Sequence, residues 1–160
     1  MHHFAYQNGT LHAEGVDLAK LAAEVGTPMY VYSTATIERH YQVLSGAFKG
    51  QDHLVCFAVK ANSNQAVLAT LARLGAGKDV VSEGELRRAR AAGVPANRII
   101  FAGVGKTRAE MAYALKEGIL GFNVESAPEL EQLNEVALSL GVKAPIAIRV
   151  NLDVYEKSNS

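Results

Sequence analysis

Short β-like segments alternate with amphipathic helical segments along most of the 160-residue chain. The β-like segments are rich in branched and aromatic residues, and the helical ones place apolar residues three and four positions apart. Connections of only a few residues separate them, which is typical of parallel strands joined through helices. This alternation predicts an α/β fold, with a parallel sheet covered by helices. The expected strands are 29–33, 53–60, 79–82, 98–103, 121–124 and 146–150.

The first residues follow a different pattern. Residues 3–13 place Phe-Ala-Tyr and Leu-His-Ala on either side of Asn8-Gly9, a turn pair that favours positive φ, and this predicts a β-hairpin. A short helix is expected to start after Asp17 and to end at Gly26. We therefore expect one unit over residues 1–27, a hairpin and short helix, and a second over 28–160.

Three helix starts carry a Ser or Thr followed three residues later by Glu, the pattern of a capping box. The pairs are Ser82 with Glu85, Thr107 with Glu110, and Ser126 with Glu129.

The two faces of the expected strands differ. In the segment before residue 60, one face carries Val55, Phe57 and Val59, and the other carries Cys56, Ala58 and Lys60. Residues 121–125 and 146–150 repeat this division between bulky apolar and small or polar side chains. An open sheet needs bulk on both faces, whereas a barrel needs it outside, under its helices. The pattern favours a (β/α)₈ barrel, which takes about 250 residues, so we expect an incomplete one.

Composition excludes several classes of protein. Hydrophobic residues make up 49% and charged residues 20%, a soluble globular profile, and 16 basic residues balance 16 acidic ones. No charge excess indicates nucleic acid or an anionic membrane, and neither a signal peptide nor a membrane-spanning stretch is visible. One cysteine and five scattered histidines give no metal-ligand spacing. We expect a cytoplasmic protein without a metal site.

Lys60 ends an apolar run in the segment CFAVKANSN. A lysine at the carboxyl end of a strand could place a desolvated amine in a barrel mouth, where a lowered pKa suits covalent chemistry with a carbonyl group. It could equally extend to solvent from a strand end. Position alone leaves both interpretations open.

Three other parts of the sequence are candidate sites. The stretch GVGKT, 103–107, resembles a phosphate loop, but Ile100 stands where the first glycine is required, so a strand-to-helix loop capped by Thr107 is favoured over nucleotide hydrolysis. Asp79 is either a ligand-binding group or an ordinary loop carboxylate. Arg149 lies on an otherwise small face, and its charge requires an anionic partner from protein or ligand.

Several linked motifs carry a family resemblance. The stretches YVYSTATIERHY, CFAVKANSNQAVL, GAGKDVVSEGELRRA, IIFAGVGKT, FNVESAPEL and IRVNLD resemble the amino-terminal half of the diaminopimelate decarboxylases, relatives of the ornithine and arginine decarboxylases. The resemblance covers about residues 30–150. It implies the pyridoxal phosphate-binding barrel of the alanine racemase type, a following β domain and a homodimer. It also implies decarboxylation of meso-2,6-diaminopimelate to L-lysine.

By the same resemblance, Lys60 matches the lysine that holds pyridoxal phosphate in the motif Y-A-V-K-A-N, with Phe57 in place of the commoner tyrosine. Asp79 matches the aspartate of G-x-D-V-x-S, which lies beside that lysine in relatives. Arg149 matches an arginine near the cofactor ring. Lys78 departs from the family, in which an uncharged residue is usual at that position.

The end of the chain also departs from the family pattern. Leu152 replaces a proline, the match fades from Tyr155, and the remaining site groups belong to a second half that is not in this sequence. We therefore expect a shortened chain that is inactive alone, with unpaired strand edges. The alternatives are a non-catalytic cofactor-binding or regulatory relic of the same fold, or another amino-acid decarboxylase or racemase.

Overall fold

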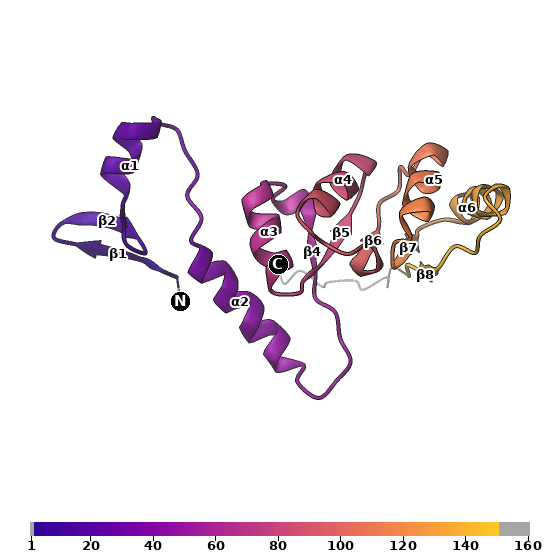
Figure 1. The fold of residues 1–160 in the computed structure, drawn as a ribbon, viewed down its shortest axis with the longest axis horizontal. Helices are drawn as coiled ribbons and strands as arrows, with labels where there is room; N and C mark the ends of the chain where they lie inside the picture. Colours follow the sequence, from indigo (N-terminus) through magenta and orange to yellow (C-terminus); the bar gives the residue numbers. More distant parts are fainter. Residues whose placement is uncertain (1, 151–160) are drawn as a thin grey trace, which may run out of the picture.

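The computed structural model describes residues 2–150, which form two separate sheets. The larger is a five-stranded parallel sheet in which each strand pairs with the next along the chain (Figure 1). Its strands are β4 (Cys56–Ala58), β5 (Gly77–Val80), β6 (Ile99–Phe101), β7 (Gly121–Val124) and β8 (Ile146–Ile148). Leu152 and Tyr155, where the sequence departs from the family, lie outside the described residues.

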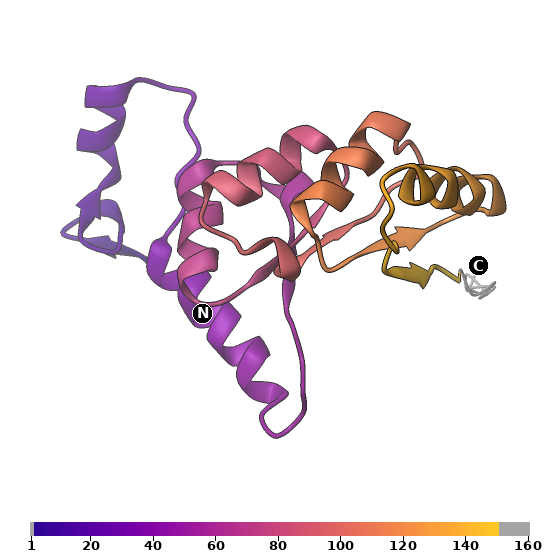
Figure 2. The same cartoon turned by 45° about the vertical axis from the view of Figure 1, so that its right-hand side comes forward.

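Helices connect these strands and lie along one face of the sheet, as Figures 1 and 2 show. They are α3 (Gln65–Arg73), α4 (Glu83–Ala91), α5 (Arg108–Glu117) and α6 (Ala127–Ser139). Two 3₁₀ turns, Val59–Ala61 and Ala96–Arg98, complete the connections. Because each crossover places its helix on the same face, we call that face the outer face and the other the inner face.

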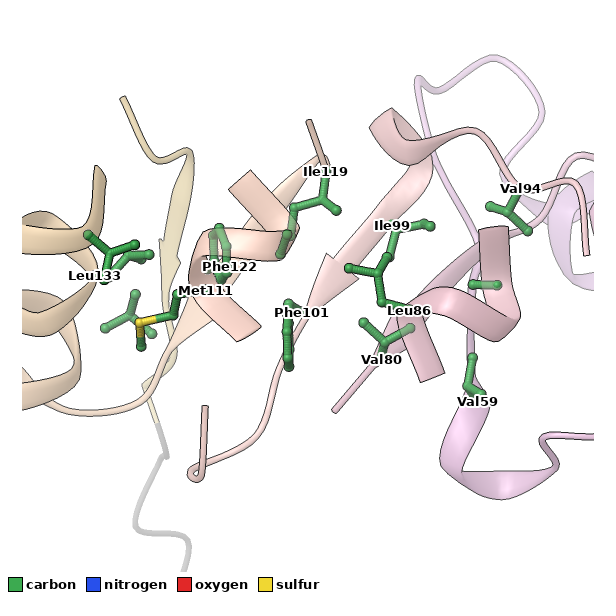
Figure 3. Close-up of a cluster of buried hydrophobic side chains, with 14 of the residues drawn as sticks. Val59, Val80, Leu86, Val94, Ile99, Phe101, Met111, Ile119, Phe122 and Leu133 are labelled. Atoms are coloured by element: carbon green, nitrogen blue, oxygen red, sulfur yellow. The ribbon is translucent and has the colours of Figure 1, made fainter. Parts of the chain in front are cut away.

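The outer face is packed with bulky side chains. Figure 3 shows Val80, Phe101 and Phe122 of the strands facing Leu86, Met111 and Leu133 of the helices, all essentially inaccessible to solvent. The rings of Phe101 and Phe122 stack with centroids 6.0 Å apart. The sequence prediction that bulk lies outside, under the helices, is confirmed for β7, where Phe122 and Val124 are buried, whereas Ile146 and Ile148 of β8 are 43% and 69% exposed. The predicted class, an α/β fold with a partial barrel and an N-terminal hairpin, is also confirmed.

The smaller sheet contains β1 (Phe4–Gln7), β2 (Thr10–Ala13) and β3 (Val16–Asp17), and it is antiparallel. Asn8 and Gly9 form the predicted turn, with φ of 50° and 82°. Helix α1 (Leu18–Val25) then starts at Asp17, whose carboxylate accepts hydrogen bonds from two backbone N–H groups. This region lies away from the parallel sheet (Figures 1 and 2).

One predicted strand is absent from the structure. Residues 29–33 have no regular secondary structure and connect α1 to α2 (Thr34–Ala47). Tyr30 and Tyr32 are 91% and 55% exposed, and neither sheet includes this segment, so the β-like pattern has no partner strand. The connection is instead held by Glu14, which accepts hydrogen bonds from Ser33 Oγ at 2.7 Å and Ala35 N at 3.0 Å.

The predicted helix starts are confirmed, but only one forms the complete capping box. Thr107 and Glu110 exchange both hydrogen bonds at the start of α5. Ser82 and Ser126 also cap their helices, whereas the partner glutamates accept from the residue before the cap, Val81 N and Glu125 N. Each of these glutamates therefore binds the residue that directly follows a strand to the helix that comes next.

No helix in the part of the chain that the structure describes is both long enough and apolar enough to cross a membrane.

Candidate functional site

Polar side chains gather where the parallel strands end, at the carboxyl edge of the sheet. Lys60 lies just beyond β4, and here the predicted strand was too long. The strand ends at Ala58, and Lys60 lies in the turn Val59–Ala61, closed by a hydrogen bond from Asn62 N to Val59 O. Val59 fills the core, and the turn leaves Lys60 exposed, so Lys60 does not continue the alternation of the strand.

Asp79 lies in β5, in register with Ala58 on one side and Ile100 on the other. Its Oδ1 atom is buried and has no hydrogen-bond partner among residues 2–150. Burial raises the pKa of Asp79, and the positive charge of Lys60, which follows the register partner of Asp79 along the chain, opposes that rise. A buried carboxylate oxygen without a donor is costly, so this position is suited to a donor or cation from a ligand.

Arg149 follows β8, and its backbone N–H donates to Val124 O at 2.9 Å. Its NH1 donates to Glu125 Oε2 at 3.2 Å. The anionic partner required by the sequence is therefore supplied at least by the protein, through Glu125 at the end of β7. Arg149 also influences Asp79, whose pKa it lowers. Lys60, Asp79 and Arg149 all lie at the carboxyl edge of the sheet, and we call these three residues the charged cluster.

The inner face below this cluster is lined with small residues. Cys56 and Gly77 are register partners on adjacent strands. A Cβ atom added to Gly77 would lie 2.7 Å from Cys56 Sγ and 2.5 Å from Arg98 O, so only glycine fits at this point. Burial raises the pKa of the Cys56 thiol, with a further contribution from Asp79.

Lys106, from the GVGKT stretch, is turned into the protein. Its Nζ donates to Gly103 O at 2.7 Å, Asn123 O at 2.8 Å and Glu129 Oε1 at 2.6 Å. The side chain is inaccessible to solvent. An ammonium group with three protein acceptors has no donor left for a phosphate. The predicted strand-to-helix loop capped by Thr107 is confirmed.

Two members of this region were not predicted as site residues, Glu125 and Lys106. Glu125 accepts from Gly103 N at 2.7 Å as well as from Arg149, and its charge raises the pKa of Asp79. The sequence signal was present, because Glu125 stands on the small face directly after a strand, where the capping pattern begins. Lys106 carried a signal only for phosphate binding.

Residues 34–160 match the family described as "Pyridoxal-dependent decarboxylase, pyridoxal binding domain". The chain belongs to this family. The matched domain also confirms pyridoxal as the family's cofactor.

Among curated proteins of this family, the chain is 56% identical over 160 residues to the diaminopimelate decarboxylase of Vibrio cholerae. That match covers 99% of this chain and 38% of the relative. The chain therefore spans well under half the length of the relative that it matches.

Solved structures agree with the sequence comparison. A diaminopimelate decarboxylase from m. jannaschi superposes with a TM-score of 0.92 at 39% identity, over 98% of this chain and 38% of that one. The diaminopimelate decarboxylase from Helicobacter pylori complexed with L-lysine gives a TM-score of 0.82 at 45% identity, over 84% of this chain and 34% of that one.

Proposed function

We propose that this chain carries the cofactor lysine, Lys60, of a pyridoxal phosphate-dependent diaminopimelate decarboxylase. The observation that supports this most directly is the position of an exposed Lys60 just beyond Ala58, the register partner of Asp79, one carboxylate oxygen of which is buried and has no donor among residues 2–150. The family match and the relatives named diaminopimelate decarboxylase supply the reaction and the substrate class. Substrate would be meso-diaminopimelate and product L-lysine.

The residues present fit the cofactor. Lys60 offers an accessible primary amine, and a lysine amine bonds covalently to an aldehyde only in its neutral form. Asp79 offers a carboxylate beside it that can accept a proton or balance a cation. When bound, pyridoxal phosphate supplies an electron sink for the pair released as the substrate carboxylate leaves.

The roles that we assign to this chain's own residues are limited to holding and charge balance. Lys60 would hold the cofactor and give up that place to the substrate amine. Asp79 would balance positive charge at the carboxyl edge of the sheet, beside the strand end that carries Lys60. Arg149, fixed by Glu125, presents a cation at the same edge of the sheet.

Further parts of the proposal concern the whole protein. We place the hairpin unit at residues 1–27 and the cofactor-binding unit at 28–160. The active assembly is a cytoplasmic homodimer of longer chains, and the 160-residue chain alone binds cofactor without turning over substrate. The short span relative to the Vibrio relative supports this last point.

The test is covalent capture of pyridoxal phosphate. The chain is mixed with the cofactor, reduced with borohydride and digested, and the modified lysine is located by mass spectrometry. We expect a pyridoxyl group on Lys60, absent in Lys60→Met and retained in Lys116→Met, a variant of an exposed lysine on α5. Labelling spread over exposed lysines, or equal in both variants, would refute the assignment of Lys60.

An activity assay separates the remaining alternatives. Carbon dioxide release from meso-diaminopimelate at rates typical of enzymes would contradict the expected inactivity of this chain. Specific labelling of Lys60 without release fits our proposal. No labelling would favour a relic of the fold that has lost cofactor binding.

A further inference from the structure

Two loops at the carboxyl edge of the sheet are joined by a closed ring of hydrogen bonds through Gly103, Lys106, Glu125 and Glu129. Gly103 donates its N–H to Glu125 Oε1, and its carbonyl accepts from Lys106 Nζ. Lys106 also donates to Glu129 Oε1, and Glu129 Oε2 accepts from Glu125 N at 3.1 Å. We call this the hydrogen-bond ring; it joins the β6–α5 loop to the β7–α6 loop.

One carboxylate oxygen of Glu125, Oε2, is not part of the ring and binds Arg149 instead. Glu125 Oε2 accepts from Arg149 NH1, so the third strand end, that of β8, is attached to the two loops. The Glu125 side chain is 10% exposed and that of Arg149 is 53% exposed. Arg149 therefore reaches solvent at the edge of the sheet, while its partner Glu125 is held in place by the hydrogen-bond ring.

Chain folding alone does not require charges at these positions. The sheet is already held to its helices by the apolar outer face, and buried ion pairs contribute little net stability compared with apolar groups of similar size. What the ring does supply is a fixed position for a carboxylate, and through it for a guanidinium, at the same carboxyl edge of the sheet as Asp79. The charged groups acting on Asp79 are Lys60, Glu125, Arg149 and Lys106.

We propose that Glu125 is a positioning residue of the candidate cofactor site, held by the hydrogen-bond ring so that it orients Arg149 and places negative charge at the same carboxyl edge of the sheet as Asp79. The inference deepens the proposed function and rests on it. Glu125 acts through Arg149 and Asp79. Lys106 sets the position of Glu125 through Gly103 and Glu129.

The test is an NMR titration of the Asp79 side-chain carboxyl carbon in the chain without cofactor. Glu125→Gln removes the negative charge and keeps an acceptor for Gly103 N, so the midpoint of Asp79 should fall, by about half to one pH unit. Arg149→Gln removes the cation, and the midpoint should rise. Glu117→Gln is the matched control, because Glu117 also bonds an arginine, Arg90, but on the exposed helices α4 and α5.

Opposite shifts in the Glu125 and Arg149 variants, with no shift in the control, support the proposal. It is overturned if Asp79 titrates in Glu125→Gln as it does in Glu117→Gln. Arg149 is exposed, so its variant remains informative even if Glu125→Gln unfolds, and an unchanged midpoint there also overturns the proposal. Because no cofactor is present, a failure to capture pyridoxal phosphate would count against the proposed function alone.

Discussion

The outer face of the parallel sheet and the loops at its carboxyl edge each bury one lysine, with opposite arrangements around it. Lys78 lies on the outer face, fully inaccessible, and its Nζ has no hydrogen-bond partner in the described part of the chain. Its nearest aromatic ring is that of Phe57, with the centroid 5.9 Å from Nζ. Lys106 at the carboxyl edge is equally buried but donates to three oxygens.

The two surroundings have different consequences for charge. Burial lowers the pKa of Lys78 to about 8, whereas Lys106 has a carboxylate at 2.6 Å. A buried amine without a partner is destabilised in its charged form, and a carboxylate in contact with a buried amine offsets that cost. Burial alone therefore does not show whether a lysine takes part in function. The partners of the amine decide whether its buried charge stabilises or destabilises the fold.

The largest effect is expected from Lys106→Met. It leaves Glu129 and two carbonyls without their donor, and breaking a buried pair in this way costs about 3–5 kcal/mol of unfolding free energy. Urea denaturation followed by circular dichroism measures this cost. The exposed control Lys116→Met should lie within about 0.5 kcal/mol of the parent chain. Equal stability of the two variants would show that the three bonds to Lys106 are dispensable.

A smaller effect of opposite sign is expected from Lys78→Met. Lowering a pKa from 10.5 to about 8 costs on the order of 3 kcal/mol when the group is charged, so the variant should be more stable at neutral pH. The folded chain binds fewer protons than the unfolded chain between these values. The parent should therefore gain stability from about pH 8 to 10.5, and lose that gain below about pH 8.

Denaturation curves at several pH values test this expectation. The difference between Lys78→Met and the parent should be full below pH 8 and should shrink toward pH 10.5. A difference that stays constant over this range would mean that Lys78 finds a partner in solution.

The smallest effect is expected from Arg108→Gln. Arg108 donates to Glu135 at 2.7 Å, nearly the same separation as the Lys106 pair, but both side chains are more than half exposed. Exposed pairs contribute at most about 0.5 kcal/mol, and salt screens them. The same urea assay should find little change in the unfolding free energy, and less at high salt. A loss of unfolding free energy as large as that of Lys106→Met would show that burial does not explain the difference between the Lys106 and Arg108 ion pairs.

Local sequence patterns predicted the regular elements well where each element satisfies its own hydrogen bonds. The caps at Ser82, Thr107 and Ser126 start helices as expected, because a side chain three residues away is always within reach. The Asn8-Gly9 turn is equally local. Strands were predicted less well, because a strand exists only if another strand pairs with it. Residues 29–33 have the composition of a strand and no partner.

The candidate site residues show the same division between local and long-range information. Lys60, Asp79 and Arg149 are predicted from motifs, and the structure places all three at the carboxyl edge of the sheet. The sequence placed Lys60 on the strand itself, however, whereas it lies in the following turn. Glu125 and Lys106 were missed as a pair because they are linked through Gly103 and Glu129, across two loops.

By itself the sequence determined the fold class, the order of strands and helices and the residue types offered for chemistry, since periodicity, capping and motif spacing act over a few residues. Only the tertiary structure decided which charges meet. Lys78 lies within β5 and Lys106 in the loop before α5, and no local pattern shows which amine finds partners. Two of the oxygens around Lys106, from Asn123 and Glu129, come from segments far along the chain, the third comes from the neighbouring Gly103, and Lys78 Nζ has no partner among the described residues.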